Sequence, residues 1–115
     1  MLSYRHAFHA GNHADVLKHL VLVQLIDYLK QKDKPFWVVD THAGAGLYAL
    51  DAGDATQLSE HEGGIARLWA RADLPPAVAA YVEAVRPLIP KGTLTAYPGS
   101  PWIAFQRLRA DDRLR

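Results

Sequence analysis

The sequence predicts an α/β fold with few strands, because a helix, a buried strand and a glycine-rich loop follow one another. Apolar residues recur at three- and four-residue steps from about His13 to Lys32, which is the period of a helix. The short apolar run from Phe36 to Val39 is typical of a strand buried on both faces of a parallel sheet. Asp40 and the loop Gly44-Ala45-Gly46 follow it, at the edge where open α/β sheets bind ligands.

Length and composition limit the chain to one domain or part of one. It has 115 residues, of which 50% are hydrophobic and 22% charged, and this suits a soluble globular protein. No apolar run approaches a membrane span, and the N-terminus lacks a signal peptide's apolar core, so we expect a cytoplasmic protein with no membrane partner. The chain has no cysteine, which excludes disulfides and Cys-based zinc sites.

Residues 1–11 are predicted to form an arm that contacts nucleic acid. Tyr4 and Phe8 supply aromatic faces, and Arg5, His6 and His9 place positive or titratable groups among them. This mixture suits stacking on a base and contact with a phosphate. The alternative is a surface tail whose aromatic side chains pack onto the domain.

The predicted helix begins after Asn12, a candidate N-cap. Lys18 and His19 lie one step off its apolar stripe, so the alternatives to a functional role are a solvated lysine and a hydrogen-bonded boundary histidine. The stripe is wide, which predicts a helix packed on more than one side, and it comprises Val16, Leu17, Leu20, Val21, Leu25, Ile26 and Leu29.

A metal site has to be considered, because His9, His13, Asp15 and His19 lie close together in the sequence. The chain has no His-Glu-x-x-His motif, and His9 precedes the predicted helix, so the i,i+4 geometry of a ligand pair is not secured. We assign no metal site, and a histidine-bound metal protein remains the weakest alternative.

The glycine loop indicates a nucleotide-like ligand. Gly44 to Ala49 fits the dinucleotide pattern G-x-G-x-x-G/A, which requires a helix directly after the loop. The helical pattern ends within a turn, at Asp51-Ala52-Gly53-Asp54, so no helix N-terminus for a pyrophosphate is evident. Such a loop suits a ligand without a pyrophosphate, for example S-adenosylmethionine. The alternative is an ordinary strand-to-loop turn.

Two short helices are predicted between about residues 58 and 89, as an insertion beside the sheet. Ser59-Glu60-His61-Glu62 matches a capping box that starts the first helix, and Pro75-Pro76 suits the first turn of the second.

The chain is then predicted to return to the sheet. Thr93 to Tyr97 alternates as a short strand does, and Leu114-Arg115 resembles the start of another. Between them, Ser100 as N-cap with Pro101 at the first helical position predicts a helix whose start lies near the glycine loop.

Several separated stretches occur together in one known family. They are Met1 to His19, Lys32 to Phe36, Asp40 to Gly46, Gly63 to Trp69, and Tyr97 to Pro101. The chain, from residue 1 to about 109, resembles the N-terminal portion of the RlmJ family of bacterial 23S ribosomal RNA adenine-N6 methyltransferases.

The resemblance implies the N-terminal part of a Rossmann-like class I methyltransferase with a helical insertion, in which this portion is mostly helical and has one or two strands. The implied divisions are the substrate-binding arm, 1–11; the first helix, first strand and cofactor loop, 12–50; the inserted helical subdomain, 51–92; and the return to the methyltransferase domain, 93–115.

The resemblance also implies a cofactor and a substrate. S-adenosylmethionine would be bound through residues matching His19, His42 and Ser100, beside Gly44 and Gly46 of the loop. The target adenosine of 23S ribosomal RNA would be contacted by residues matching three in this chain, namely Tyr4, His6 and Lys18.

The group that polarises the adenine amine belongs to an Asp-Pro-Pro-Tyr motif in that family, and this sequence has no such motif. No catalytic residue is therefore assigned in this chain, which we expect to be inactive alone and to self-associate, whereas the full-length protein is expected to be monomeric. The alternative function is a non-catalytic nucleic-acid or nucleotide-binding module with a basic N-terminal arm.

Overall fold

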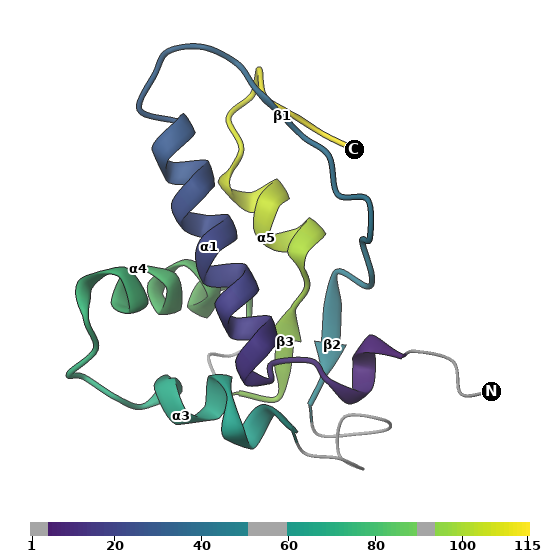
Figure 1. The fold of residues 1–115 in the computed structure, drawn as a ribbon, viewed down its shortest axis with the longest axis vertical. Coiled ribbons are helices and arrows are strands. Elements are labelled where there is room, and N and C mark those ends of the chain that lie inside the picture. The colour runs from purple at the N-terminus through teal and green to yellow at the C-terminus, as the bar shows by residue number, and fades with distance from the viewer. Residues whose placement is uncertain (1–4, 51–59, 90–93) are drawn as a thin grey trace.

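The structure is a computed structural model that describes residues 5–50, 60–89 and 94–115. Helix α1 runs through the molecule beside α5, with α3 and α4 at one end and the pair β1 and β4 at the other (Figure 1). The elements in chain order are η1 (His6–Phe8), α1 (His13–Leu29), β1 (Trp37–Val38), β2 (Leu47–Ala49), η2 (Glu60–Gly63), α3 (Ile65–Trp69), α4 (Pro76–Val85), η3 (Arg86–Leu88), β3 (Ala96–Pro98), α5 (Ser100–Arg107) and β4 (Arg113–Leu114).

The strands form two separate pairs. β1 pairs in parallel with β4, with Trp37 opposite Arg113, which confirms that a strand begins at the end of the sequence. β2 pairs antiparallel with β3, with Tyr48 opposite Tyr97. The sequence did not predict β2. It correctly indicated that no helix follows Gly46, but a strand of three residues takes that place.

Helix α1 is capped as predicted, because Asn12 Oδ1 accepts a hydrogen bond from the Asp15 N–H at 2.8 Å. It ends at Leu29 rather than Lys32. The prediction that it packs on more than one side is wrong for the described chain, since Leu17 and Leu25 are 61% and 55% exposed. The buried side instead comprises Asp15, His19, Val23 and Ile26.

The core lies where the buried side of α1 meets α4, α5 and β3. Tyr81 of α4 and Tyr97 of β3 are the largest of its fully buried side chains. The rest of the cluster is apolar and comes from segments far apart in the sequence: Ala10, Val23, Leu50, Ile65, Val82, Val85 and Ile103. This core places β3 and the first turn of α5 against α1, and so fixes one wall of the site.

Strand β1 is not buried on both faces, contrary to the prediction. Trp37 is 63% and Val39 61% exposed, and the strand comprises only Trp37 and Val38. Among the described residues β4 is its one paired strand, so the apolar run has less cover than the centre of a sheet provides.

The insertion and the return to the sheet agree with the prediction in part. Helix α4 begins at Pro76, and the short helix before it is α3, preceded by the 3-10 turn η2. Strand β3 lies at Ala96–Pro98, somewhat later than predicted. Ser59 of the capping box, Thr93 and the segment 51–54 lie outside the described residues.

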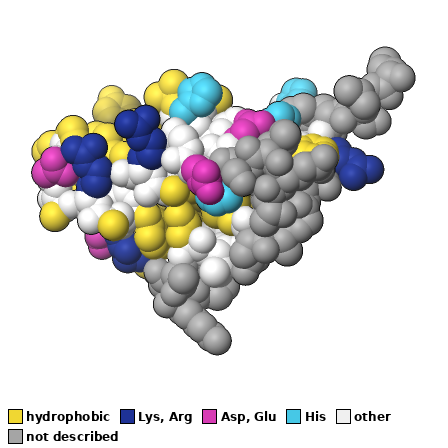
Figure 2. All heavy atoms as spheres, turned by 90° about the horizontal axis from the view of Figure 1, so that it is seen from below, with side chains coloured by type: hydrophobic (Ala, Val, Ile, Leu, Met, Phe, Trp, Pro, Cys, Tyr) yellow, Lys and Arg dark blue, Asp and Glu magenta, His cyan; other side chains and the backbone are white. Residues whose placement is uncertain are grey.

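Figure 2 views the molecule from the end that carries α3 and α4. In the part of this face formed by described residues, Lys or Arg and Asp or Glu side chains both occur, with hydrophobic side chains between them. This described surface therefore carries both signs of charge. No helix in the described part of the chain has the length and hydropathy of a membrane span.

The two neighbouring glycines Gly63 and Gly64 allow a matched test of the packing between α1 and α3. A Cβ on Gly64 would lie 2.1 Å from the Gly11 carbonyl oxygen, whereas one on Gly63 would meet nothing within 4 Å. We expect Gly64→Ala to lower the free energy of unfolding by roughly 1–3 kcal/mol and Gly63→Ala to change it by about 0.5 kcal/mol or less. Urea denaturation measures both, and equal effects would contradict this packing.

Candidate functional site

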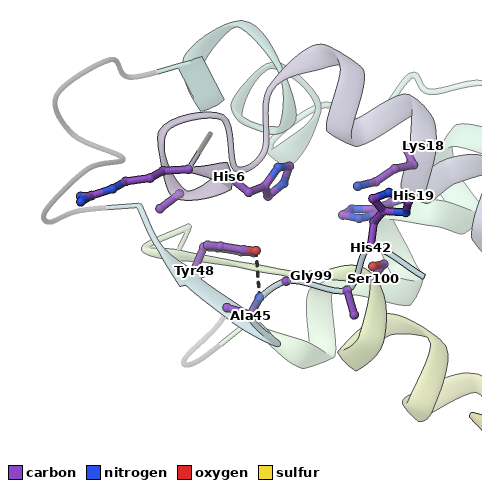
Figure 3. A pocket seen from close by; sticks show the side chains of 12 residues that line it. His6, Lys18, His19, His42, Ala45, Tyr48, Gly99 and Ser100 are labelled. Atoms are coloured by element: carbon purple, nitrogen blue, oxygen red, sulfur yellow. Dashed lines mark hydrogen bonds between the residues drawn. The ribbon is translucent and has the colours of Figure 1, made fainter. Parts of the chain in front are cut away.

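A pocket of about 600 Å³ lies between the arm, α1, the glycine loop and the first turn of α5. Figure 3 shows His6 and Lys18 on one side of it and Tyr48, Ala45, Gly99 and Ser100 on the other. The predicted site residues that it brings together are His6, Lys18, His19, His42, Gly44 and Ser100. Gly46 does not line it, and Tyr4 lies outside the described residues.

Helix α1 supplies two consecutive pocket residues with opposite environments. The Lys18 side chain is 58% exposed, whereas that of His19 is 1% exposed. Each helical step turns by about 100°, so the two side chains leave the helix in different directions. Lys18 can therefore reach a ligand in solvent, and His19 contacts the pocket from the core.

His19 is held in the core through two tyrosines. Its Nδ1 lies 2.7 Å from the Tyr97 hydroxyl, which is hydrogen-bonded to the Tyr81 hydroxyl. Burial lowers the pKa of His19 to about 4, although the Asp15 carboxylate opposes this shift, so the imidazole is neutral near pH 7. Burial also raises the pKa of both tyrosines, which keeps their hydroxyl groups protonated.

The glycine loop is exposed, and Tyr48 supports it through a hydrogen bond. The Tyr48 hydroxyl accepts a hydrogen bond from the Ala45 N–H at 2.9 Å (Figure 3). A Cβ on Gly44 would lie 2.2 Å from that hydroxyl oxygen, and one on Gly99 would lie 2.1 Å from the Ala45 carbonyl oxygen. A side chain at Gly99 would therefore require the backbone to shift, whereas one at Gly44 would displace the Tyr48 hydroxyl.

Gly46 differs from Gly44 in its surroundings. A Cβ on Gly46 would have Trp102 Cβ as its nearest neighbour at 3.8 Å, which is ordinary contact. The Gly46 carbonyl instead accepts a hydrogen bond from the Gly99 N–H at 2.9 Å, a backbone contact that any residue can make.

Ser100 does not cap its helix, so that prediction is wrong. Gly99 is the N-cap, and the Ser100 hydroxyl donates to Asp40 Oδ2 at 2.6 Å. A carboxylate is a stronger acceptor than a neutral group, and Asp40 lies at the end of β1, directly beside α5. Asp40 Oδ1 also accepts from the His42 N–H at 3.3 Å, so one carboxylate joins the loop to α5.

The described part of the arm is packed on the domain. His6 Nε2 lies 3.0 Å from Asp15 Oδ2, and the His6 ring meets the Tyr48 ring edge-on with 5.2 Å between centroids. His9 Nδ1 lies 3.0 Å from Glu60 Oε2, which ties the other end of η1 to the insertion. The arm therefore closes one side of the pocket.

The histidines do not form a metal site in the described chain. No group of three or more His, Cys, Asp or Glu side chains among the described residues is placed to hold a metal ion. His9 pairs with Glu60, whereas His6 and His19 both face Asp15.

Three residues near the pocket were not found from the sequence: Tyr48, Gly99 and Asp15. Tyr48 lies on the strand that was not predicted, and the role of Gly99 depends on a backbone segment far away in the sequence. Asp15 was considered only as a metal ligand. Its burial follows from the side of α1 that faces the core, and the apolar pattern did not indicate that side.

The family model described as "Ribosomal RNA large subunit methyltransferase D, RlmJ" matches residues 33–115, which is most of the chain. The chain belongs to the RlmJ family. It is 54% identical over all of its 115 residues to the ribosomal RNA large subunit methyltransferase J of Escherichia coli, and it covers 41% of that protein. It is 49% identical over 114 residues to the protein of the same name from Haemophilus influenzae, again covering 41% of it.

The fold is also shared with a solved structure. A crystal structure of a Legionella pneumophila protein, described under the family name DUF519, matches with a TM-score of 0.81 and 40% sequence identity. The match covers 91% of this chain and 38% of the Legionella chain. The chain thus spans about two fifths of the length of its RlmJ relatives, and it has the mixed helix and strand fold of their N-terminal part.

The buried His19 predicts how stability depends on pH. Its pKa is about 4 in the folded protein against a usual value of 6.5, so between these values the unfolded chain binds a proton that the folded chain does not. Stability should be fully present above pH 6.5 and fall as the pH drops toward 4, by on the order of 3 kcal/mol.

The measurement is urea denaturation at several pH values between 4 and 7. His19→Gln should flatten the dependence on pH in this window, and His13→Gln, at an exposed position of the same helix, should leave it as in the wild type. The same slope in His19→Gln and the wild type would contradict the neutral, buried state of His19.

Proposed function

We propose that the protein carrying this chain transfers a methyl group from S-adenosylmethionine to the N6 atom of an adenosine in 23S ribosomal RNA. The observation that carries the proposal is the single pocket in which the arm, Lys18 and the glycine loop meet. Membership of the RlmJ family supports a ribosomal RNA methyltransferase. The adenosine, its N6 atom and the methyl donor are the finer part of the proposal.

The pocket suits S-adenosylmethionine in size and in its polar groups. Ligand pockets of about 300–1,000 Å³ are usual for small molecules, and this one has about 600 Å³. His19 lines the pocket; its Nε2 is buried and makes no hydrogen bond within the described chain, and its nearest acidic neighbour is Asp15 Oδ1 at 3.5 Å. His42, Ser100 and the exposed backbone of the loop supply further donors and acceptors. The cofactor, when bound, supplies an electrophilic methyl group on a sulfonium.

The opposite side of the pocket suits the RNA. His6 and Lys18 face the loop across it (Figure 3). Arg5 also lines the pocket. A lysine and an arginine favour a phosphate backbone, and Tyr4, next to Arg5, is proposed to stack on the target base. Base stacking contributes roughly 1–3 kcal/mol per aromatic side chain.

This chain contributes positioning and binding. The arm and the loop would hold the adenine amine in line with the methyl group and exclude water, an effect that accounts for much of the acceleration in such transfers. The group that polarises the amine is expected in the family's Asp-Pro-Pro-Tyr motif, so no residue of this chain is assigned that role.

The direct test uses the protein of the complete reading frame, 23S ribosomal RNA and methyl-labelled S-adenosylmethionine. We expect label in N6-methyladenosine after digestion to nucleosides, identified by mass spectrometry, and none with 16S ribosomal RNA as the control. A protein that binds 23S RNA without transferring label would instead support the non-catalytic binding module.

The glycine loop provides a sharper test of the cofactor site. The Cβ in Gly44→Ala should displace the Tyr48 hydroxyl from the Ala45 N–H, since it would lie 2.2 Å from that oxygen. Gly46→Ala is the matched control, with 3.8 Å to its nearest neighbour.

We expect Gly44→Ala to weaken S-adenosylmethionine binding by about tenfold, or about 1.4 kcal/mol, and Gly46→Ala to change it little. Isothermal titration calorimetry measures both affinities, and RNA binding should persist in both variants. Equal cofactor affinity in the two would contradict the assignment of the loop.

A further inference from the structure

Three pocket residues and the backbone of the arm converge on one buried carboxylate, that of Asp15. Its Oδ2 accepts from the Gly11 N–H and from His6 Nε2, each at 3.0 Å. Its Oδ1 lies 3.4 Å from Lys18 Nζ and 3.5 Å from His19 Nε2. The Asp15 side chain is only 1% exposed, so the carboxylate depends on these partners rather than on water.

The Asp15 carboxylate is charged in spite of its burial. Burial raises its pKa, but the neighbouring His19 and His6 and the Gly11 N–H together bring the pKa below the usual value. His19 is neutral near pH 7, so Lys18 supplies the positive charge beside the carboxylate and His6 an N–H donor. A buried carboxylate without such partners strongly destabilises the folded state. The contacts with Asp15 therefore favour the state in which the arm is packed on the domain.

We propose that Asp15 is a positioning residue: it holds the arm over the pocket and orients His6 and Lys18 toward the RNA. This proposal rests on the proposed function for its effect on methyl transfer, but its effect on the arm can be measured independently. Asp15 does not contact the reacting atoms in this scheme. It acts through the two side chains that line the pocket.

The arm needs such a contact because its own structure is slight. The 3-10 turn η1 has three residues, no side-chain cap and no buried residue. The His9–Glu60 pair secures its C-terminal end, where both side chains are about one third exposed. The contact of His6 with Asp15 lies at the N-terminal end of η1, directly after Tyr4 and Arg5 in the sequence. It also keeps the His6 ring against Tyr48, whose hydroxyl accepts from the Ala45 N–H of the glycine loop.

The test compares Asp15→Asn with Asp27→Asn in the protein of the complete reading frame. Asp27 is a matched control, because it lies on the same helix and pairs with Arg107 at 2.6 Å, away from the pocket. The amide of Asp15→Asn keeps the shape of the side chain and removes the charge.

The first measurement is trypsin cleavage after Arg5, followed by mass spectrometry of the native protein. A charge-assisted hydrogen bond corresponds to roughly a tenfold change in an equilibrium, so we expect cleavage to be about tenfold faster in Asp15→Asn and unchanged in Asp27→Asn. Cleavage after Arg5 as slow in Asp15→Asn as in the control would overturn the proposal.

The second measurement is the kinetics of methyl transfer. In Asp15→Asn, kcat/KM for RNA should fall by roughly tenfold, while the Kd of S-adenosylmethionine changes by less than about threefold, because His19 keeps its Tyr97 contact. A general loss of folding would instead lower kcat/KM and weaken the binding of S-adenosylmethionine as well. If the wild-type protein transfers no methyl group, the proposed function fails, whereas the trypsin comparison still tests the arm.

His6 provides a second route if Asp15→Asn does not fold. His6→Ala removes the donor to Asp15, whereas the amide of His6→Gln can still donate a hydrogen bond. We expect fast cleavage after Arg5 in His6→Ala and slower cleavage, closer to the wild type, in His6→Gln. Equal cleavage in the wild type and His6→Ala would overturn the proposal whatever Asp15→Asn does.

Discussion

The contact between residues 40–49 and residues 96–100 determines whether the pocket exists. The antiparallel pairing of β2 with β3 brings the two segments together, and the Gly99 N–H then donates to the Gly46 carbonyl. The Ser100 hydroxyl closes the contact on Asp40. Bringing together segments about fifty residues apart lowers the conformational entropy of the chain between them. Burial of Tyr97 in the core beside α1 offsets this cost. The glycine loop therefore depends on the core for its position.

Local signals in the sequence predicted the elements whose causes are local. Asn12 caps α1, no helix follows the glycine loop, and α4 begins at Pro76. The signals for these three features are a capping side chain, the end of the helical apolar period and a proline, and each acts within one turn of the chain. Strand β2 could not be predicted in this way, since three residues form a strand only when β3 lies opposite them. The prediction that Ser100 caps α5 was wrong for the same reason, because the hydroxyl donates to a carboxylate sixty positions earlier in the chain.

The resemblance to a family implied site residues that periodicity did not indicate. Of the six that it implied, His6, Lys18, His19, His42 and Ser100 line one pocket, and Tyr4 lies outside the described residues. Their roles stay a prediction. The apolar stripe predicted for α1 includes Ile26, which is buried, but also Leu17 and Leu25, which are exposed. The true buried side carries Asp15 and His19, two polar residues that become acceptable in a core only through partners on other elements. No count of apolar residues can reveal those partners.

One turn of α1 serves both sides of the pocket, and this limits how the two sides can move. Lys18 faces solvent on the arm side and His19 faces the core, although the two residues are adjacent on one rigid helix. Groups on a helix are held more accurately than groups on a loop, so the backbone positions of Lys18 and His19 are fixed relative to each other, and both residues line the pocket from one helix. The arm and the exposed loop at residues 41–46 approach these two residues from other segments of the chain. Tyr48 links them, because its ring contacts the His6 ring and its hydroxyl accepts a hydrogen bond from the Ala45 N–H. Tyr48 therefore couples the position of the loop to that of the arm, while α1 is the common reference for both.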